Sequence, residues 1–197
     1  SATYEELPEN LVNAFVAIED SRFWTHDGID LRSIARAVKG VVSDDYSGGG
    51  STITQQLIKN NIFSGGMETS WGARIERKLQ EQYLAVQLEE KEEKVSKTES
   101  NKDEKSNEVQ NKEETKKTII TNYLNTINLG SNTLGVKVAA RRYFNKEVSD
   151  LTLAECTVLA SITSNPSRYN PITNPENNNT RRQIVLQNMV DQNYISK

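Results

Sequence analysis

The protein has 197 residues, of which 35% are hydrophobic and 26% are charged, with a formal net charge of −3. This length fits one domain with room for a small subdomain, and the acidic balance argues against nucleic acid as a partner. One cysteine and one histidine exclude a disulfide framework and a zinc site built from Cys and His. No apolar run approaches the ~18 residues of a membrane-spanning helix.

Helical patterns dominate the first ninety residues. Pro8 suits a first helical turn, and an apolar stripe follows at helical spacing, made of Leu11, Val12, Phe15 and Val16. Further helices are predicted from Asp30 or Leu31 to about Val42, from about 52 to 60, and from Trp71 or Ala73 to Leu88. The elements are thus helices separated by glycine-rich breaks.

Residues 89–117 hold ten acidic side chains and eight lysines, and their only large apolar residues are Val95 and Val109. Such a composition buries too little apolar surface to offset the entropy of ordering. We therefore expect a charged insert that is disordered or forms a solvated helical extension.

Regular structure is expected again from Thr118. Thr152 and Glu155 have the spacing of a capping box that opens a helix through Ile162, and Asn174-Pro175 starts a terminal helix. No convincing strand is found, so the predicted fold class is mostly α.

The segment from Glu19 to Gly28 carries the first candidate chemistry. Glu19 falls at the end of an apolar helix, where a carboxylate is disfavoured as an anion, a property that suits a general base or acid. The alternative is a surface glutamate that closes a helix, with His26 and Asp27 making hydrogen bonds within a turn.

A glycine loop, residues 48–50, leads into the second candidate. Ser51, Gln55 and Lys59 are spaced i, i+4 and i+8, so hydroxyl, amide and ammonium groups share one helical face. With free N–H groups at the helix start, this strip fits a phosphate or pyrophosphate. The alternative is a capped helix after a loop, because Thr52 and Gln55 have capping-box spacing.

The third candidate is the stretch from Arg74 to Glu81. Arg74, Arg77 and Lys78 extend the cationic strip, with Glu81 as a second carboxylate. The alternative is an i, i+4 ion pair between Arg77 and Glu81, which is worth a few tenths of a kcal/mol.

These clusters resemble the motifs of glycosyltransferase family 51, the peptidoglycan glycosyltransferase domain of class A penicillin-binding proteins and monofunctional transglycosylases. E-D-x-x-F-x-x-H-x-G matches residues 19–28, G-x-S-T-I-T-Q-Q-x-x-K-N matches 49–60, and R-K-x-x-E matches 77–81. Tyr123-Leu124-Asn125 matches a fourth motif, and Arg181-Arg182 through Met189 is close to a fifth. The resemblance spans about residues 8–190.

The resemblance implies a lysozyme-like, two-lobed helical fold over residues 1–197. Within it we expect a small jaw subdomain at about 29–72 and the charged insert at 89–117. No S-x-x-K or K-T-G motif occurs in these residues, so no transpeptidase site is expected within them.

The resemblance also implies an inverting polymerisation of lipid II that releases undecaprenyl pyrophosphate. Glu19 is then the general base, and Glu81 holds cations or a divalent metal, Mg²⁺ or Mn²⁺. The further expected substrate-binding residues are Asp20, His26, Ser51, Thr52, Gln55, Gln56, Lys59, Asn60, Arg74, Arg77 and Lys78.

The implied partners are lipid II, the nascent glycan strand and other cell-wall synthesis proteins, at the extracytoplasmic face of the bacterial cytoplasmic membrane. Contact with the membrane interface is assigned to apolar residues of the jaw: Val38, Val41, Val42, Ile62, Phe63, Met67 and Trp71. Such a domain is also expected to bind moenomycin, an inhibitor that mimics the donor.

Two other functions compete with this one. A lysozyme-like, glycan-cleaving enzyme also uses two carboxylates, although it does not need Lys59, Arg77 and Lys78 together. A non-catalytic scaffold of the cell wall predicts the loss of a motif carboxylate or lysine, and none is lost.

Overall fold

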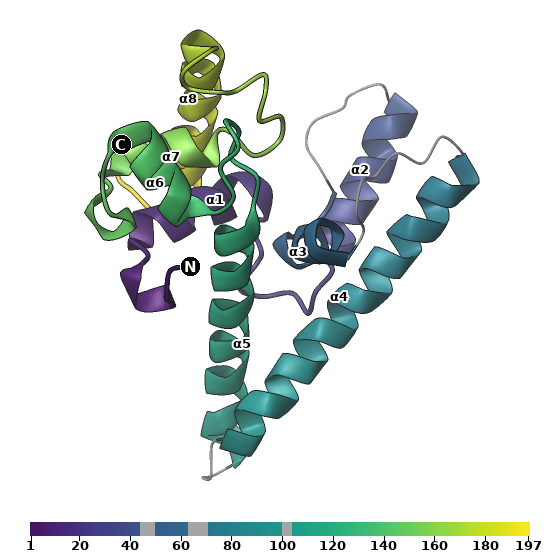
Figure 1. The fold of residues 1–197 in the computed structure, drawn as a ribbon. Helices are drawn as coiled ribbons and strands as arrows, with labels where there is room; N and C mark the ends of the chain where they lie inside the picture. Colours follow the sequence, from purple (N-terminus) through teal and green to yellow (C-terminus); the bar gives the residue numbers. More distant parts are fainter. Residues whose placement is uncertain (44–49, 63–70, 100–103) are drawn as a thin grey trace. The chain divides into compact units, whose positions relative to one another are not determined.

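A computed structural model describes residues 1–43, 50–62, 71–99 and 104–197. Over these ranges the fold is mostly helical, as predicted, and contains no strand apart from an isolated antiparallel bridge between Asn128 and Leu134 (Figure 1). The α-helices are α1 (Glu9–Glu19), α2 (Leu31–Ser43), α3 (Ile53–Ile62), α4 (Trp71–Glu99), α5 (Glu104–Thr126), α6 (Val136–Phe144), α7 (Leu153–Ala160) and α8 (Pro175–Asp191), with 3₁₀ turns at Tyr4–Glu6 and Val148–Asp150.

The chain divides into two compact units. The first comprises residues 1–21 and 121–197, and the second comprises residues 22–120. The predicted jaw, at about 29–72, lies within the second unit, and its separate boundaries stay a prediction.

The core of the first unit is built around α1, which packs against α7 and α8. The predicted apolar stripe is confirmed, because Leu11 and Phe15 are fully buried. Phe15 meets the buried ring of Tyr123 edge to face, with ring centroids 6.3 Å apart, an arrangement that aromatic pairs favour. The C-terminal end of α1 is thus fixed in a rigid core.

Local sequence signals set most helix starts in this unit. Thr152 and Glu155 form the predicted capping box of α7, and Pro175 occupies the first turn of α8. Helix α6 was not predicted. It begins after Gly135, which has φ of 82°, and a Cβ there would lie 2.3 Å from the Asn125 carbonyl oxygen, so no other residue fits without a shift.

In the second unit α3 packs against α4, and Asp30 caps α2. The Asp30 carboxylate accepts hydrogen bonds from the backbone N–H groups of Arg32 and Ser33 and from the side chains of Ser33 and Arg22. These contacts satisfy free amides of the first turn of α2. They explain why the helix begins where the sequence predicted.

The disordered interpretation of residues 89–117 is wrong for the described part of the segment. α4 continues to Glu99, and α5 already begins at Glu104. The solvated helical extension is the better description, with one correction. Glu89, Asn111, Thr115 and Lys116 are buried, so the two ends of the segment belong to the core of the second unit.

The membrane-facing residues proposed from the sequence are tested at one position only. Ile62 is exposed, while the side chains of Val38, Val41, Val42, Phe63, Met67 and Trp71 lie outside the described residues. Among the described helices, none is long and apolar enough to cross a membrane.

The Asp30 cap predicts a loss of stability in acid. Burial alone raises the pKa of Asp30, but hydrogen bonds from Arg22 and Ser33 outweigh it and lower the pKa to about 2. A carboxyl with a lowered folded-state pKa stabilises the fold above its unfolded pKa of about 4 and loses that contribution as the pH falls towards 2.

The expected contribution is at most about 2 kcal/mol. Urea unfolding of the wild type and Asp30→Asn, compared from pH 6 to pH 2, measures it. The difference between the two proteins should shrink below pH 4. A difference that stays constant over the whole range would contradict the cap.

Candidate active site

Glu19, the proposed base, is the last residue of α1. Its Oε1 atom accepts a hydrogen bond from the Thr163 hydroxyl and lies 3.9 Å from Nη2 of Arg181. Its side chain is 13% exposed, so a substrate can reach it. A hydroxyl donor and a nearby guanidinium can both hold a carboxylate in position, and a positioned carboxylate is what a general base requires.

The surroundings of Glu19 are held by side chains of α8 and of the segments next to it. Asn188 and Gln192, on and just after α8, donate to the Ala17 carbonyl at 3.3 and 2.9 Å, which satisfies a carbonyl at the end of α1. The Arg181 guanidinium lies over the Tyr169 ring, 5.1 Å from its centroid. These contacts restrict how the carboxylate and the guanidinium can move.

Asp20, the next residue, is buried. Burial, followed by the charges of Glu19 and Asp20, raises the pKa of Tyr123 well above its ordinary value. Tyr123 therefore stays neutral. The acidic residues Glu19 and Asp20 lie at this end of the first unit together with Arg181.

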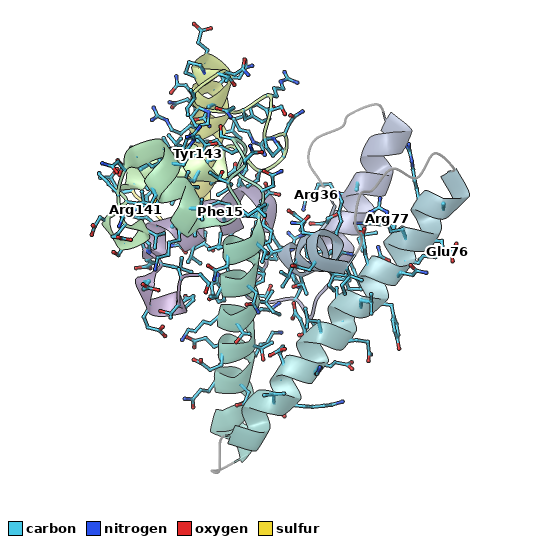
Figure 2. All side chains as sticks on the ribbon, viewed as in Figure 1. Phe15, Arg36, Glu76, Arg77, Arg141 and Tyr143 are labelled. Carbon is cyan, nitrogen blue, oxygen red and sulfur yellow. The ribbon has the colours of Figure 1, made fainter. Side chains whose placement is uncertain are left out.

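In the second unit, the third motif forms a compact ionic cluster. Arg77 and Lys78 both bind the buried carboxylate of Glu81, with Lys78 Nζ 3.2 Å from Oε2. Lys78 also donates to the Ser51 hydroxyl at 2.5 Å, which links the third motif to the second. Figure 2 shows Arg77 on α4. Two cations on one carboxylate leave a surplus positive charge, as a phosphate site requires.

The second motif forms the predicted capping box. The Thr52 N–H donates to Gln55 Oε1 at 2.8 Å, and the Gln55 N–H donates to the Thr52 hydroxyl at 3.1 Å. Gln55 is therefore buried, whereas Lys59 is exposed. The predicted strip of Ser51, Gln55 and Lys59 is therefore not one exposed row of side chains, because Gln55 in its middle is buried. The Gln55 Nε2 group is buried without a hydrogen-bond partner.

The remaining predicted substrate-binding residues of α3 and α4 lie towards solvent. Lys59, Asn60 and Arg74 are exposed, and Gln56 is half-buried. Their roles in substrate binding stay predictions.

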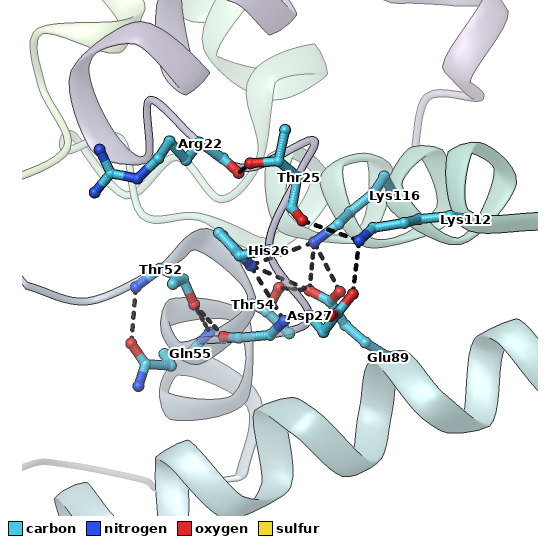
Figure 3. Close-up of polar contacts among 11 residues, drawn as sticks. Arg22, Thr25, His26, Asp27, Thr52, Thr54, Gln55, Glu89, Lys112 and Lys116 are labelled. Carbon is cyan, nitrogen blue, oxygen red and sulfur yellow. Dashed lines mark hydrogen bonds and ion pairs between the residues drawn. The ribbon is translucent and has the colours of Figure 1, made fainter. Parts of the chain in front are cut away.

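His26 joins a buried polar cluster rather than the ionic cluster at Glu81 (Figure 3). Its Nδ1 accepts a hydrogen bond from the Gly28 N–H at 3.1 Å, which is the turn hydrogen bond of the alternative interpretation. Glu89 occupies the centre of this cluster. It accepts hydrogen bonds from Thr54 at 2.6 Å and from Lys116 at 2.7 and 2.8 Å.

Gly28 explains why the first motif ends in glycine. Its φ is 91°, and a Cβ there would lie 2.5 Å from the Ala85 carbonyl oxygen. The Thr52 hydroxyl also donates to the Gly28 carbonyl, at 2.6 Å. The end of the first motif is thereby held against α4 and the start of α3, and a larger residue at position 28 would displace it.

The residues around Glu81 do not fit a resident metal. Both Glu81 oxygens contact cations, and the described part of the chain has no group of three or more His, Cys, Asp or Glu side chains that could hold an ion. The divalent metal stays a prediction.

Sequence reasoning missed two kinds of residue. Thr163 carries no motif signal, and Arg181 was noticed only as part of the fifth motif. Glu89 and Lys116 lie in a charged run of the sequence, and their composition gives no sign that they are buried and paired in the fold. Long-range contacts of this kind leave no spacing pattern in a single sequence.

Comparison with known proteins identifies the class. Residues 1–100 and 105–190 match the family model described as transglycosylase. The chain therefore belongs to the transglycosylase family, and the match includes every predicted site residue.

The curated relatives are penicillin-binding proteins. The chain is 40% identical over 204 residues to penicillin-binding protein 1A of Clostridium novyi, which covers 98% of this chain and 21% of that protein. It is 38% identical over 192 residues to penicillin-binding protein 1F of Bacillus subtilis, which covers 97% of this chain and 23% of that protein. The chain thus spans about a fifth of the length of these relatives.

The Glu89 cluster predicts a large effect of removing Lys116, whose side chain is 1% exposed. Lys116→Met leaves a buried carboxylate without its cation, and breaking a buried pair in this way costs about 3–5 kcal/mol. Urea unfolding measures the loss.

Lys117→Met is the matched control. Lys117 pairs with Glu113 and Glu114, which are mostly exposed, and such surface pairs contribute about 0–1 kcal/mol. Equal losses in the two variants would show that the buried cluster is not a special determinant of stability.

Proposed function

We propose that this chain is a peptidoglycan glycosyltransferase domain that joins lipid II units into glycan strands. The observation that carries the proposal is Glu19, a partly exposed carboxylate held by Thr163 and Arg181 in a member of the transglycosylase family. A sugar hydroxyl is a poor nucleophile at neutral pH, so its attack needs a positioned base.

In the proposed step, Glu19 takes the proton of the acceptor's 4-hydroxyl as that oxygen bonds to the anomeric carbon of the donor. The bond between the anomeric carbon and the pyrophosphate oxygen breaks, and its electron pair leaves with the pyrophosphate. Attack from the face opposite the leaving group inverts the anomeric centre. The proton remains on Glu19 until it is released to solvent.

The leaving pyrophosphate gains negative charge, which cations stabilise best. Arg77 and Lys78 are the proposed stabilising groups, because Glu81 fixes both in place. Ser51 is oriented by Lys78 and is proposed to contact the same diphosphate. Lys59, which is exposed on α3, is proposed to add a further cation.

The cations favour a transferase over a glycan-cleaving enzyme. A hydrolase needs a second carboxylate free to act on water or on the sugar, whereas both oxygens of Glu81 contact Arg77 and Lys78. A scaffold function is disfavoured because each motif carboxylate and lysine is present.

The substrate class implies where the domain works. A polyprenyl-linked donor places the reaction at a membrane surface, and we propose the extracytoplasmic face of the bacterial membrane. The names of the relatives support a role beside other cell-wall synthesis proteins.

The test is an incubation with lipid II in mild detergent, with the products separated on a gel. The wild type should give a ladder of glycan strands, and Glu19→Gln should lower the rate by at least about a hundredfold, since it removes the general base. Circular dichroism and moenomycin binding serve as controls for the fold and for donor binding.

Near-normal polymerisation by Glu19→Gln would refute the base assignment. A wild type that makes no ladder and binds no moenomycin would refute the glycosyltransferase proposal itself.

A further inference from the structure

Thr163, just beyond the C-terminal end of α7, is the residue that the described contacts connect most directly to Glu19. Its hydroxyl lies within hydrogen-bond distance of two acceptors, Glu19 Oε1 and the Ala160 carbonyl oxygen, the latter at 3.2 Å. A hydroxyl has one proton to donate. Thr163 can therefore fully serve only one of these acceptors at a time.

We propose that Thr163 is a positioning residue for the general base, and that its hydroxyl favours the anionic form of Glu19 without obstructing its protonation. The proposal rests on the function assigned to Glu19 above. While Glu19 is a carboxylate, its charged oxygen is a stronger acceptor than the neutral Ala160 carbonyl, so the Thr163 proton points to Glu19.

Proton transfer from the acceptor sugar changes this balance. A neutral carboxylic acid is a weaker hydrogen-bond acceptor than a carboxylate, so the Thr163 O–H can turn to the Ala160 carbonyl. Thr163 gains and loses no proton in this rotation. The carbonyl thus provides an alternative partner that keeps the hydroxyl satisfied in both states of Glu19.

Other groups near Glu19 differ from Thr163 in how they act on it. Arg181, on α8, lies 3.9 Å away, beyond normal hydrogen-bond distance, so this contact acts through charge. Asp20, the neighbour in sequence, is a second acidic residue. Tyr123, on α5, stays neutral because of its raised pKa. The Thr163 hydroxyl donates directly to Glu19.

The test separates the hydroxyl from the shape of the side chain. Thr163→Val keeps the size and removes the hydroxyl, whereas Thr163→Ser keeps the hydroxyl and removes the methyl. Thr157→Val is the matched control, because the Thr157 hydroxyl also donates to the carbonyl three residues earlier, that of Ala154, at 2.8 Å.

Two readouts are measured on each variant. The first is the titration midpoint of the Glu19 carboxyl carbon, followed by NMR and assigned with Glu19→Gln. The second is the pH profile of lipid II polymerisation, with kcat and KM separated. Loss of a hydrogen bond to a charged group corresponds to about tenfold or more in an equilibrium or a rate.

In Thr163→Val the Glu19 midpoint should move up by about one pH unit, and kcat at pH 7 should fall by about tenfold or more with KM little changed. Thr163→Ser should restore both readouts, and Thr157→Val should move neither. An unmoved Glu19 midpoint in Thr163→Val would overturn the proposal, as would a serine variant as impaired as the valine variant.

The two proposals fail in different ways. A wild type without polymerase activity refutes the glycosyltransferase function, yet the carboxyl titration still decides whether Thr163 controls Glu19. A wild type that polymerises lipid II, with no effect of Thr163→Val on either readout, refutes the role of Thr163 alone.

Discussion

The buried ion pair between Glu89 and Lys116 is the contact on which the second unit depends most. Both side chains are almost completely removed from water, so each needs the other to offset its loss of hydration. Glu89 also accepts a hydrogen bond from Thr54, and Lys116 lies 3.4 Å from His26 Nδ1. One pair of charges thus ties α4 and α5 to the first and second motifs.

The ion pair between Glu89 and Lys116 also affects the cationic cluster at Glu81, through the end of the first motif and the start of α3. With the first motif fixed against α4 at Gly28, Thr52 can reach the Gly28 carbonyl and cap α3. The start of α3 then presents Ser51 to Lys78, one turn from Glu81 on α4. The cationic cluster proposed to bind a pyrophosphate is therefore an extension of the polar core, and its charges are held before any ligand arrives.

The elements that could be predicted are those set by local chemistry. The helix at α1 follows from an apolar stripe, α7 from its capping box, and α8 from Pro175 at its start. The motif residues could be recognised because their spacing is a sequence property, and their roles in the site stay predictions. The segment at 89–117 was misjudged because an average over charged residues does not reveal that Glu89 and Lys116 are buried together. Thr163 was missed because its partner Glu19 is 144 positions away, and such a contact leaves no local pattern in the sequence.

The buried charge cluster around Glu89 fixes the end of the first motif, at His26 and Gly28, in place, and His26, the single histidine of the chain, reports on it directly. Because Nδ1 accepts a hydrogen bond from the Gly28 N–H, the proton of the neutral ring must lie on Nε2. Nitrogen NMR of the histidine ring at neutral pH measures this. We expect an unprotonated Nδ1 and a protonated Nε2, and we expect Lys116→Met to perturb the signal. A ring with its proton on Nδ1, unaffected by Lys116→Met, would show that the buried cluster does not fix this end of the first motif.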